Sequence, residues 1–210
     1  MTWIQALSKT QINYYIYKLN KNDSILYFQA LTSNQYLIIL EGIICVLKIF
    51  NEKKKFTVGI LKTDNAVHLN NNNSRYYYKL IAFEQTYIIS FSLNMNKYIS
   101  PKILSYIIQA QKLTIQNYEI INCILKQQYT KYKIIQFILF LFIEFGMMNN
   151  KYIYLSFHLS QSKLSLITGI NKNKINNIIN QLVNQKIIRF YYNKRIYIHN
   201  IYHLFLIYCY

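Results

Sequence analysis

The pattern of apolar residues changes at Pro101, the single proline of the 210-residue chain. Before it, from about Tyr14 to Phe91, short apolar stretches are broken by polar turns, which is typical of β-strands at regular spacing. After it, residues 102–129 contain no glycine or proline, and proline itself is favoured in the first turn of a helix. The sequence therefore predicts an α+β fold in which a β-sandwich or β-roll is followed by helices.

Four stretches of the first part have the composition of strands. "QYLIILEGIICVLKIF" (35–50) predicts two strands around Glu41-Gly42, because glycine supplies the backbone conformation of a turn. Further β-branched and aromatic runs are "FTVGIL" (56–61), "YYYKLIAF" (76–83) and "QTYIISFS" (85–92). The asparagine run from Asn70 to Ser74 is expected to be a polar loop between two of these strands.

The predicted long helix, residues 102–129, is apolar on two faces. One face follows a spacing of three and four and contains Leu104, Ile108, Ile115, Tyr118 and Leu125, with Gln111 and Asn122 in the same seam. The second contains Leu113, Ile120, Ile121 and Ile124. Because such a helix must bury both faces, we expect one to pack on the β-domain and the other on a second copy, as in a coiled coil. A core helix inside a monomer is the alternative.

The chain then predicts another helix followed by a hairpin. "KIIQFILFLFIEFG" (133–146) ends at Gly146, a suitable helix C-cap, and is too short and too polar at Gln136 and Glu144 to cross a bilayer, so a buried helix is expected. "KIIRFYYNKRIYIHN" (186–200) has two β-rich runs around Asn193-Lys194, the pattern of a two-stranded hairpin.

Between them, "LSLITGINKNKINNIINQL" (164–182) predicts two short amphipathic helices around Gly169, which permits a left-handed turn residue. Ser160 can cap a helix over about 161–168 with Leu164 and Ile167 inward, and Asn171 can cap the second helix. The apolar stripe of the second helix consists of Ile175, Ile178, Ile179 and Leu182. The opposite face carries Lys172, Asn173, Lys174, Asn176, Asn177, Asn180 and Gln181.

Two helices, a tight glycine turn and a β-wing are the parts of a winged helix-turn-helix, whose second helix enters the major groove of DNA. Asparagine can bind adenine through two hydrogen bonds, and lysine reaches guanine or phosphate. The predicted DNA-binding residues are Lys172, Asn173, Lys174, Asn176 and Asn177 on the helix, with Lys194 and Arg195 on the wing. Thr168 departs from the motif, which usually has an apolar residue there. A helical hairpin that serves as core or as a protein interface is the alternative.

The charge of the chain supports a polyanionic partner only through its placement. The net charge is +17, which suits nucleic acid. Lysine, asparagine, isoleucine, tyrosine and phenylalanine are plentiful, however, while glycine, proline, tryptophan and arginine are scarce. An AT-rich genome produces the same bias, so the position of the charges must carry the argument.

Several classes of protein are not indicated. The phosphate-binding, dinucleotide-binding, nucleophile-elbow and zinc-protease motifs are absent, so neither catalytic residues nor a metal site are predicted. Cys45, Cys123 and Cys209 are widely spaced, which argues against disulfides or zinc and fits a reducing interior. His199 and His203 could form a metal pair only on a helix and are expected to be ordinary residues. The N-terminus has no signal-peptide pattern, so we expect a soluble, intracellular protein without membrane contact.

The stretch from Leu159 to Asn200 resembles the DNA-binding end of the Crp–Fnr family, in particular its nitrogen-control branch in cyanobacteria and plastids. Upstream segments resemble the same family in order: "LNKNDSILYF", "QYLIILEGIICVLKIF", "NSRYYYKLIAF" and "KIIQFILFLFIEFG". The resemblance covers roughly residues 18–200. It implies a cyclic-nucleotide-binding-like β-roll at 1–100, a dimerisation helix at 101–131 and a winged helix-turn-helix at 132–210.

The resemblance also implies a homodimer, joined through residues 102–129, that regulates transcription at a two-fold promoter site on double-stranded DNA. A bacterial-type RNA polymerase is then an expected partner. Asn177 stands where the family commonly has a base-reading arginine, and asparagine exchanges a guanine reader for an adenine reader. With the AT-rich composition, a family of this kind points to the plastid (chloroplast) stroma, or otherwise to a bacterial cytoplasm.

An effector is implied as well, since the nitrogen-control branch binds 2-oxoglutarate. Arg75 and Glu119 match two of its effector-binding residues. His68-Leu69 replaces the Phe-Gly pair of the branch in a shorter loop without glycine, and Thr114 replaces a second arginine. Loss of that arginine removes a charge-assisted hydrogen bond, roughly 1.5–3 kcal/mol. Arg75 as a surface arginine and Glu119 as a solvated helix residue are the alternatives.

Two further hypotheses stay open on the sequence. In one, a basic β-roll protein acts through protein contacts or non-specific nucleic-acid binding, with a degenerate reader helix and no effector. In the other, the β-roll is a metal-dependent enzyme.

Overall fold

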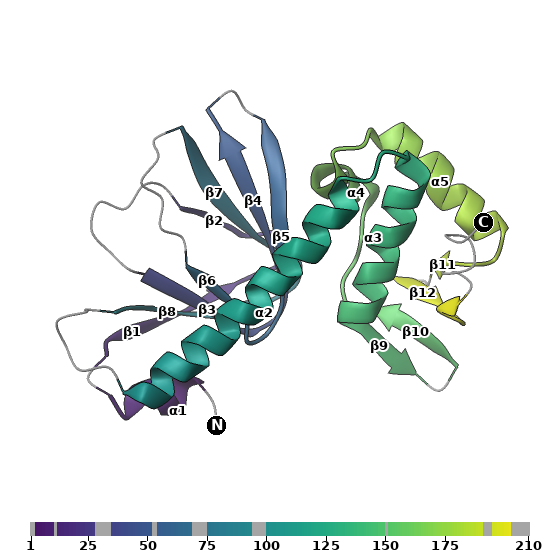
Figure 1. Cartoon of the computed structure of the whole chain (residues 1–210). Coiled ribbons are helices and arrows are strands. Elements are labelled where there is room, and N and C mark those ends of the chain that lie inside the picture. Colours follow the sequence, from purple (N-terminus) through teal and green to yellow (C-terminus); the bar gives the residue numbers. More distant parts are fainter. Residues whose placement is uncertain are drawn as a thin grey trace. The chain divides into compact units, whose positions relative to one another are not determined.

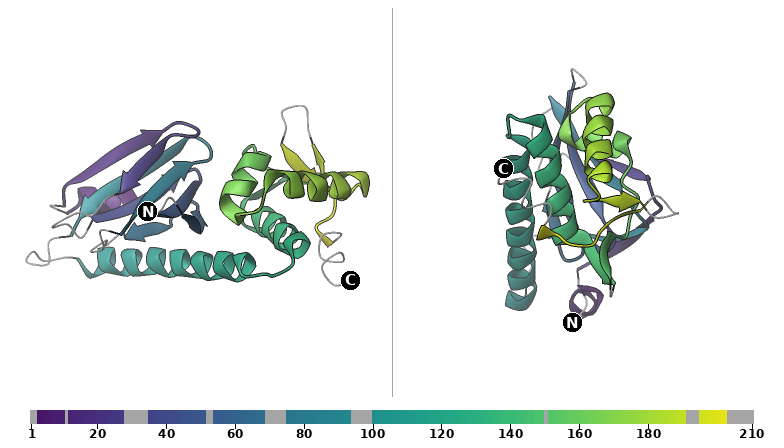
Figure 2. Two further views of the ribbon diagram at one scale, coloured as in Figure 1. Left: turned by 90° about the horizontal axis from the view of Figure 1, so that it is seen from above. Right: turned by 90° about the vertical axis from the view of Figure 1, so that its right-hand side faces the viewer.

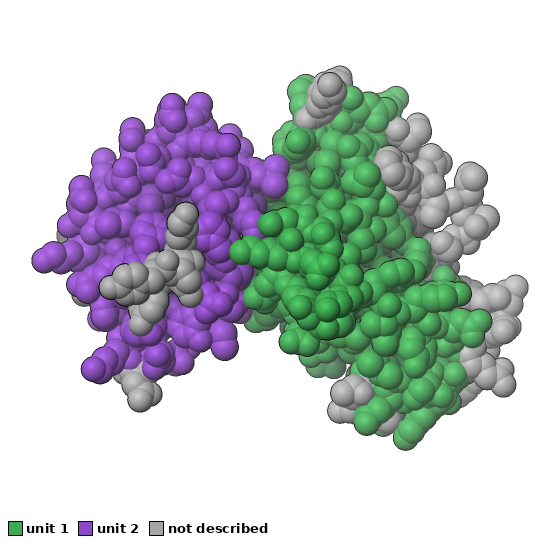
Figure 3. All heavy atoms as spheres, turned by 180° about the vertical axis from the view of Figure 1, so that it is seen from behind, with its two compact units in different colours: residues 1–120 green, residues 121–210 purple. Residues whose placement is uncertain are grey.

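The computed structural model describes residues 3–10, 12–27, 35–51, 54–68, 75–93, 100–149, 151–190 and 195–202. The chain divides into two compact units, residues 1–120 and residues 121–210 (Figure 3). The first unit holds α1 (Trp3–Ser8), β1 (Tyr14–Leu19), β2 (Ser24–Tyr27), β3 (Gln35–Glu41), β4 (Ile44–Phe50), β5 (Lys55–Leu61), β6 (Ala66–His68), β7 (Tyr76–Ala82), β8 (Thr86–Ser92) and most of α2 (Pro101–Leu125).

The strands of the first unit form a β-roll of two antiparallel sheets (Figure 1). One sheet has the order β1-β8-β3-β6 and the other the order β2-β7-β4-β5. Apolar side chains from both sheets pack together between them: Leu37, Ile39, Ile44, Val46, Leu61, Val67, Leu80 and Ile88. The predicted α+β class with an N-terminal roll is confirmed. The predicted loop at 70–74 lies outside the described residues.

Gly42 is the point at which the chain crosses from one sheet to the other. The two strands predicted around Glu41-Gly42 are present, but they do not pair with each other, since β3 and β4 belong to different sheets. Gly42 has φ of 95°, a conformation that glycine adopts without strain. The buried Thr86 hydroxyl accepts a hydrogen bond from Ile43 N at 3.3 Å and so holds the crossing in place.

The helix α2 begins at Pro101 as predicted and runs along the roll (Figure 2). It ends at Leu125, earlier than the predicted residue 129, because residues 126–129 form a turn that leads into α3. The face of α2 that meets the roll starts with Ile103, Ile107 and Ala110, which pack with Leu7, Ile38, Ile89 and Phe91.

Neither of the two faces predicted for this helix coincides with the face that meets the roll, since neither contains Ile103, Ile107 or Ala110. In the second predicted face, Leu113 and Ile120 are exposed, while Ile121 and Ile124 are buried. The roll instead receives Thr114 and Asn117, both buried. Apolar periodicity missed them because their polar atoms satisfy backbone groups of the roll, as described below.

The second unit contains α3 (Thr130–Phe145), β9 (Gly146–Asn149), β10 (Tyr152–Leu155), α4 (Gln161–Thr168), α5 (Lys172–Asn184), β11 (Arg189–Phe190) and β12 (Ile196–Ile198). The predicted buried helix is α3, which ends at Phe145 with Gly146 as its C-cap, as expected, and has nine buried residues. The strands of the second unit form one antiparallel sheet in the order β11-β12-β10-β9.

The strands β1 and β2 were predicted only as part of the strand-rich region from about Tyr14 to Phe91, and α1, β6 and the β9–β10 hairpin were not predicted at all. The helix α1 and the strand β6 have six and three residues, too few for a periodic signal. In the hairpin, "KYIYL" (151–155) has strand composition that could have been recognised. Among the described residues, none of the helices is long and apolar enough to span a membrane.

Candidate nucleic-acid interface

The helix α4 and the turn after it are set by local hydrogen bonds. Ser160 caps α4 by accepting from Lys163 N at 3.2 Å. Gly169 follows with φ of 70° and ψ of 7°, and its N–H donates to Ser165 O. Asn171 then caps α5 by accepting from Asn173 N at 2.9 Å. Both predicted caps and the left-handed glycine are confirmed.

Thr168, the residue that departed from the motif, is accommodated by its own hydroxyl. The side chain is buried, with 7 % exposed. Its Oγ1 donates to Leu164 O at 2.7 Å and accepts from Ile170 N at 3.4 Å. Since a buried polar group costs little once it is hydrogen-bonded, threonine can occupy a position that usually holds an apolar residue.

The helix α5 has one buried and one outward face. Ile175, Ile179 and Leu182 are buried, and Ile178 is half-buried. Of the predicted reader residues, Lys172, Asn173, Lys174 and Asn177 are exposed, and Asn176 is half-buried. The outward face therefore presents amides and ammonium groups, as the sequence predicted.

Asn176 is tied to the preceding helix. Gln161, the first residue of α4, donates from Nε2 to Asn176 Oδ1 at 2.7 Å. This bond joins two predicted helices through side chains 15 positions apart, so no local sequence signal could have revealed it.

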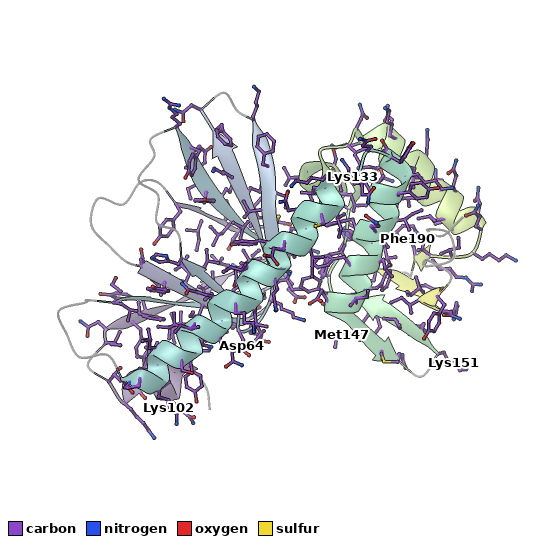
Figure 4. All side chains as sticks on the ribbon, viewed as in Figure 1. Asp64, Lys102, Lys133, Met147, Lys151 and Phe190 are labelled. Atoms are coloured by element: carbon purple, nitrogen blue, oxygen red, sulfur yellow. The ribbon has the colours of Figure 1, made fainter. Side chains whose placement is uncertain are left out.

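The wing is present as β11 and β12. These strands pair antiparallel, with Arg189 opposite Tyr197 and Phe190 opposite Ile196. Arg195 is half-buried and directly precedes β12, and Lys194 lies outside the described residues. Arg189 and Phe190 are both exposed; Figure 4 labels Phe190. Arg189, one of only three arginines in the chain, was not among the predicted DNA-binding residues.

The charged side chains that follow Glu144 in this unit are all basic. After Glu144 the chain has no aspartate or glutamate. The same segment contains eight basic residues: Lys151, Lys163, Lys172, Lys174, Lys186, Arg189, Lys194 and Arg195. An AT-rich genome explains abundant lysine but not this absence of acidic residues, which favours an anionic partner for the unit.

Comparison with known proteins agrees with this architecture. No protein-family model matches the chain. A protein of Porphyra purpurea, provisionally described as the HTH-type transcriptional regulator ycf28, is 24% identical over 203 residues, which are 94% of this chain and 84% of the relative. TTHB099, a CRP-family transcriptional regulator from Thermus thermophilus, superposes with a TM-score of 0.73 at 13% identity over 92% of this chain and 97% of its own. The chain has the Crp–Fnr fold.

A second Crp–Fnr structure shows the same similarity. TTHA1359, a CRP/FNR-family transcriptional regulator of the same organism, has a TM-score of 0.69 at 15% identity and covers 93% of this chain and 99% of its own. Together these neighbours confirm the resemblance that the sequence carried. Each is described as a transcription regulator.

The two effector residues predicted from the Crp–Fnr resemblance are both at the surface of the first unit. Arg75 directly precedes β7, is exposed, and its carbonyl accepts from Asn51 N at 3.1 Å. Glu119 is exposed on α2. Their role as effector-binding residues stays a prediction.

Thr114, which stands in place of the second effector arginine, links α2 to the roll. Its Oγ1 accepts from Ala66 N at 3.0 Å and donates to Ala110 O at 3.0 Å. Three residues on, Asn117 Oδ1 accepts from Ile60 N at 3.2 Å. Both contacts satisfy buried backbone N–H groups that would otherwise be unpaired.

Tyrosines complete this contact. The Tyr118 ring lies directly against Gly59, where any Cβ would collide with it. Burial, with a smaller contribution from the neighbouring Tyr78, raises the pKa of the Tyr118 hydroxyl. Burial likewise raises the pKa of Tyr78, so both phenols stay neutral at physiological pH. This side of α2 therefore presents uncharged hydrogen-bonding groups to the roll.

The remaining candidate ligands do not cluster. Among the described residues, no group of three or more His, Cys, Asp and Glu side chains is placed to hold a metal ion. Cys45 is buried and Cys123 exposed, and His68 stacks on Tyr36 with ring centroids 4.6 Å apart. Burial lowers the pKa of His68. His203 and Cys209 lie outside the described residues.

Proposed function

We propose that this protein is a dimeric transcription regulator that binds a two-fold DNA site through α5. The observation that carries the proposal is the outward face of α5. It presents exposed lysine and asparagine side chains from a unit that has no acidic residue after Glu144. A helix of this kind, behind a left-handed glycine turn and beside a β-wing, is the form in which helix-turn-helix proteins read the major groove.

Each side chain of α5 has an expected role. Asn173 and Asn177 are exposed near the first two turns, where side chains of a recognition helix reach base edges. An asparagine binds adenine N6 and N7 together, so A·T pairs are the expected preference. Lys172 and Lys174 can reach guanine or phosphate, and Arg189 and Arg195 on the wing are proposed to contact phosphates.

The seam of α2 supports a homodimer. Leu104, Ile108 and Ile115 remain 45 %, 58 % and 55 % exposed in the single chain. They follow a spacing of four and seven, which places them on one side of the helix. Since the roll covers a different face of α2, a second copy of the same helix is the natural partner for this seam. We name the residues Leu104, Ile108 and Ile115 the α2 seam.

Two finer assignments follow from the same proposal. A bacterial-type RNA polymerase is the proposed protein partner of the DNA-bound dimer. The plastid stroma is the proposed location. It is supported by an amino-acid composition typical of an AT-rich genome and by the ycf28 relative of Porphyra purpurea.

Replacement of Lys172 and Asn177 together by alanine is expected to remove sequence recognition. Each lost contact with a base costs about 1–3 kcal/mol, so the loss of two such contacts corresponds to a decrease of roughly 30-fold or more in operator affinity. Operators are first selected from a random DNA pool with the unaltered chain, and affinities are then measured by fluorescence anisotropy at fixed salt. The matched control is Lys151→Ala, which removes one charge at the β9–β10 hairpin, labelled in Figure 4.

The control is expected to lower all DNA affinities slightly and equally. If the double variant keeps full operator affinity, α5 is not the reader. If the unaltered chain selects no sequence and binds every duplex with the same salt dependence, the protein is a non-specific binder.

We also propose 2-oxoglutarate as an effector, which Arg75 and Glu119 support by their match to the nitrogen-control branch. Calorimetric titration of the full chain is expected to release heat at millimolar or lower ligand, and Arg75→Ala is expected to abolish it. Arg75 is exposed, so this substitution is compatible with the fold. Absence of heat with the unaltered chain would mean that the regulator works without this ligand.

A further inference from the structure

The hydrogen bond between Gln161 and Asn176 leaves one atom of Asn176 available. Gln161 Nε2 donates to Asn176 Oδ1 at 2.7 Å. Asn176 Nδ2 has no hydrogen-bond partner within the part of the chain that the structure describes. The amide of Asn176 is thus held by its oxygen, while its two N–H groups have no partner among the described residues.

The place of Asn176 on α5 puts this donor beside the reader residues. At about 100° per residue, Asn176 lies about 60° around the helix from Asn173 and 100° from Asn177. It is half-buried, on the side of α5 that meets the first residue of α4. The first residue of α4 is itself exposed, so both amides are near the surface that the proposed function assigns to DNA.

We propose that Gln161 is a positioning residue that holds Asn176 as a hydrogen-bond donor and thereby sets the base preference at one operator position. This inference rests on the proposed function. An asparagine that is free to turn can offer both its oxygen and its nitrogen to adenine. Asn176, with its oxygen engaged by Gln161, offers only N–H groups.

The consequence for base choice follows from the major groove. Guanine presents N7 and O6, adenine presents N7 and thymine presents O4 as acceptors, whereas the edge of cytosine presents only the N4 amino donor. A donor facing cytosine leaves two N–H groups opposed. Cytosine is therefore the disfavoured base at the position that Asn176 faces.

The substitution Gln161→Glu is expected to reverse this preference. A carboxylate only accepts hydrogen bonds, so it takes the Nδ2 donor of Asn176 and turns Oδ1 outward. An outward acceptor pairs with the amino groups of cytosine and adenine. The relative affinity for cytosine at that position should rise about tenfold over guanine and thymine.

The experiment selects operators from one random DNA pool with five full-length chains: unaltered, Gln161→Glu, Gln161→Ala, Asn176→Ala and Ser162→Glu. Ser162 is exposed and adjacent to Gln161. Its variant therefore adds the same negative charge but leaves the hydrogen bond between Gln161 and Asn176 in place. Gln161→Ala and Asn176→Ala are both expected to flatten the preference at one shared position. Ser162→Glu is expected to weaken binding to all sequences and leave the preference unchanged.

The outcomes separate the inference from the proposed function. If the unaltered chain selects an operator and both Gln161 variants keep the base preferences of the unaltered chain, Gln161 does not position Asn176. If Ser162→Glu changes the same position as Gln161→Glu, added charge is the cause and the inference is overturned. If the unaltered chain selects nothing, the proposed function itself fails. Thermal unfolding of each variant checks that α4 and α5 remain folded.

Discussion

A chain with aspartate in place of both Ile108 and Ile115 is expected to be a monomer that no longer binds a two-fold operator. Both side chains are more than half exposed in the single chain, so the substitutions are compatible with the fold. In a dimer they would be buried, and burying a Val/Leu/Ile side chain contributes about 1.5–3 kcal/mol. In a two-fold interface each substitution occurs in both subunits, so its energetic effect is doubled. An unpaired carboxylate at a buried seam is also strongly unfavourable.

This variant should lose more operator affinity than the replacement of any single DNA-binding residue of α5. Linking two half-site contacts in one dimer raises affinity by about 10²–10⁴ over one contact, and the monomer forfeits that factor. Sedimentation equilibrium measures the association state. Anisotropy on DNA with one or two half-sites measures the affinity, and the variant should bind both DNAs about equally.

The matched control carries aspartate at Leu113 and Ile120. These two apolar residues of α2 are also exposed, each at 43 %, but they lie on the side of the helix away from the α2 seam. The control chain should remain dimeric with full operator affinity. A dimer that survives the change at Ile108 and Ile115, or dissociates only in the control, would assign the interface to another surface.

The second large effect is expected from Gly42→Ala, which should destabilise the roll by on the order of 3 kcal/mol or more. The φ of 95° is unfavourable for any residue with a side chain. An added Cβ would also lie 2.7 Å from Gln85 O and 2.8 Å from Thr86 Cα. Both are backbone atoms of the neighbouring segment, so relief requires movement of the sheet crossing itself.

Urea unfolding measures this effect, with the fluorescence of Trp3, the only tryptophan, reporting on the first unit. Glu41→Ala, an exposed neighbour, is the control and should change the free energy of unfolding by less than about 0.5 kcal/mol. The variant Gly169→Ala tests the strain of a positive φ by itself, since no atom lies within 4 Å of the added Cβ. Its unfolding is monitored by circular dichroism. A Gly42 variant as stable as the unaltered chain would show that the crossing is not constrained.

The helix-turn-helix was predictable in detail because its signals act over short distances. The caps by Ser160 and Asn171 and the left-handed Gly169 join residues no more than four positions apart. The alternation of apolar and polar residues then decides which side of α5 turns outward. Thr168 departed from the motif, yet its hydroxyl also finds partners within four residues.

The long helix was predictable in its existence but not in its orientation. Apolar residues occur on more than one side of α2, so periodicity alone could not choose the side that meets the roll. The side that meets the roll carries Thr114 and Asn117, which pair with the backbone N–H groups of Ala66 and Ile60. Those partners are 48 and 57 positions away in the sequence.

By itself, then, the amino-acid sequence determined the α+β class, the start of α2 at Pro101, and the helices and turn that present Lys172, Asn173 and Asn177. Only the tertiary structure decided that β3 and β4 enter different sheets, which residues of α2 face the roll, and that Gln161 holds Asn176. The physical reason is distance along the chain. Caps and turns are chosen by neighbours, whereas strand partners and side-chain contacts between elements depend on where the completed fold brings remote residues together.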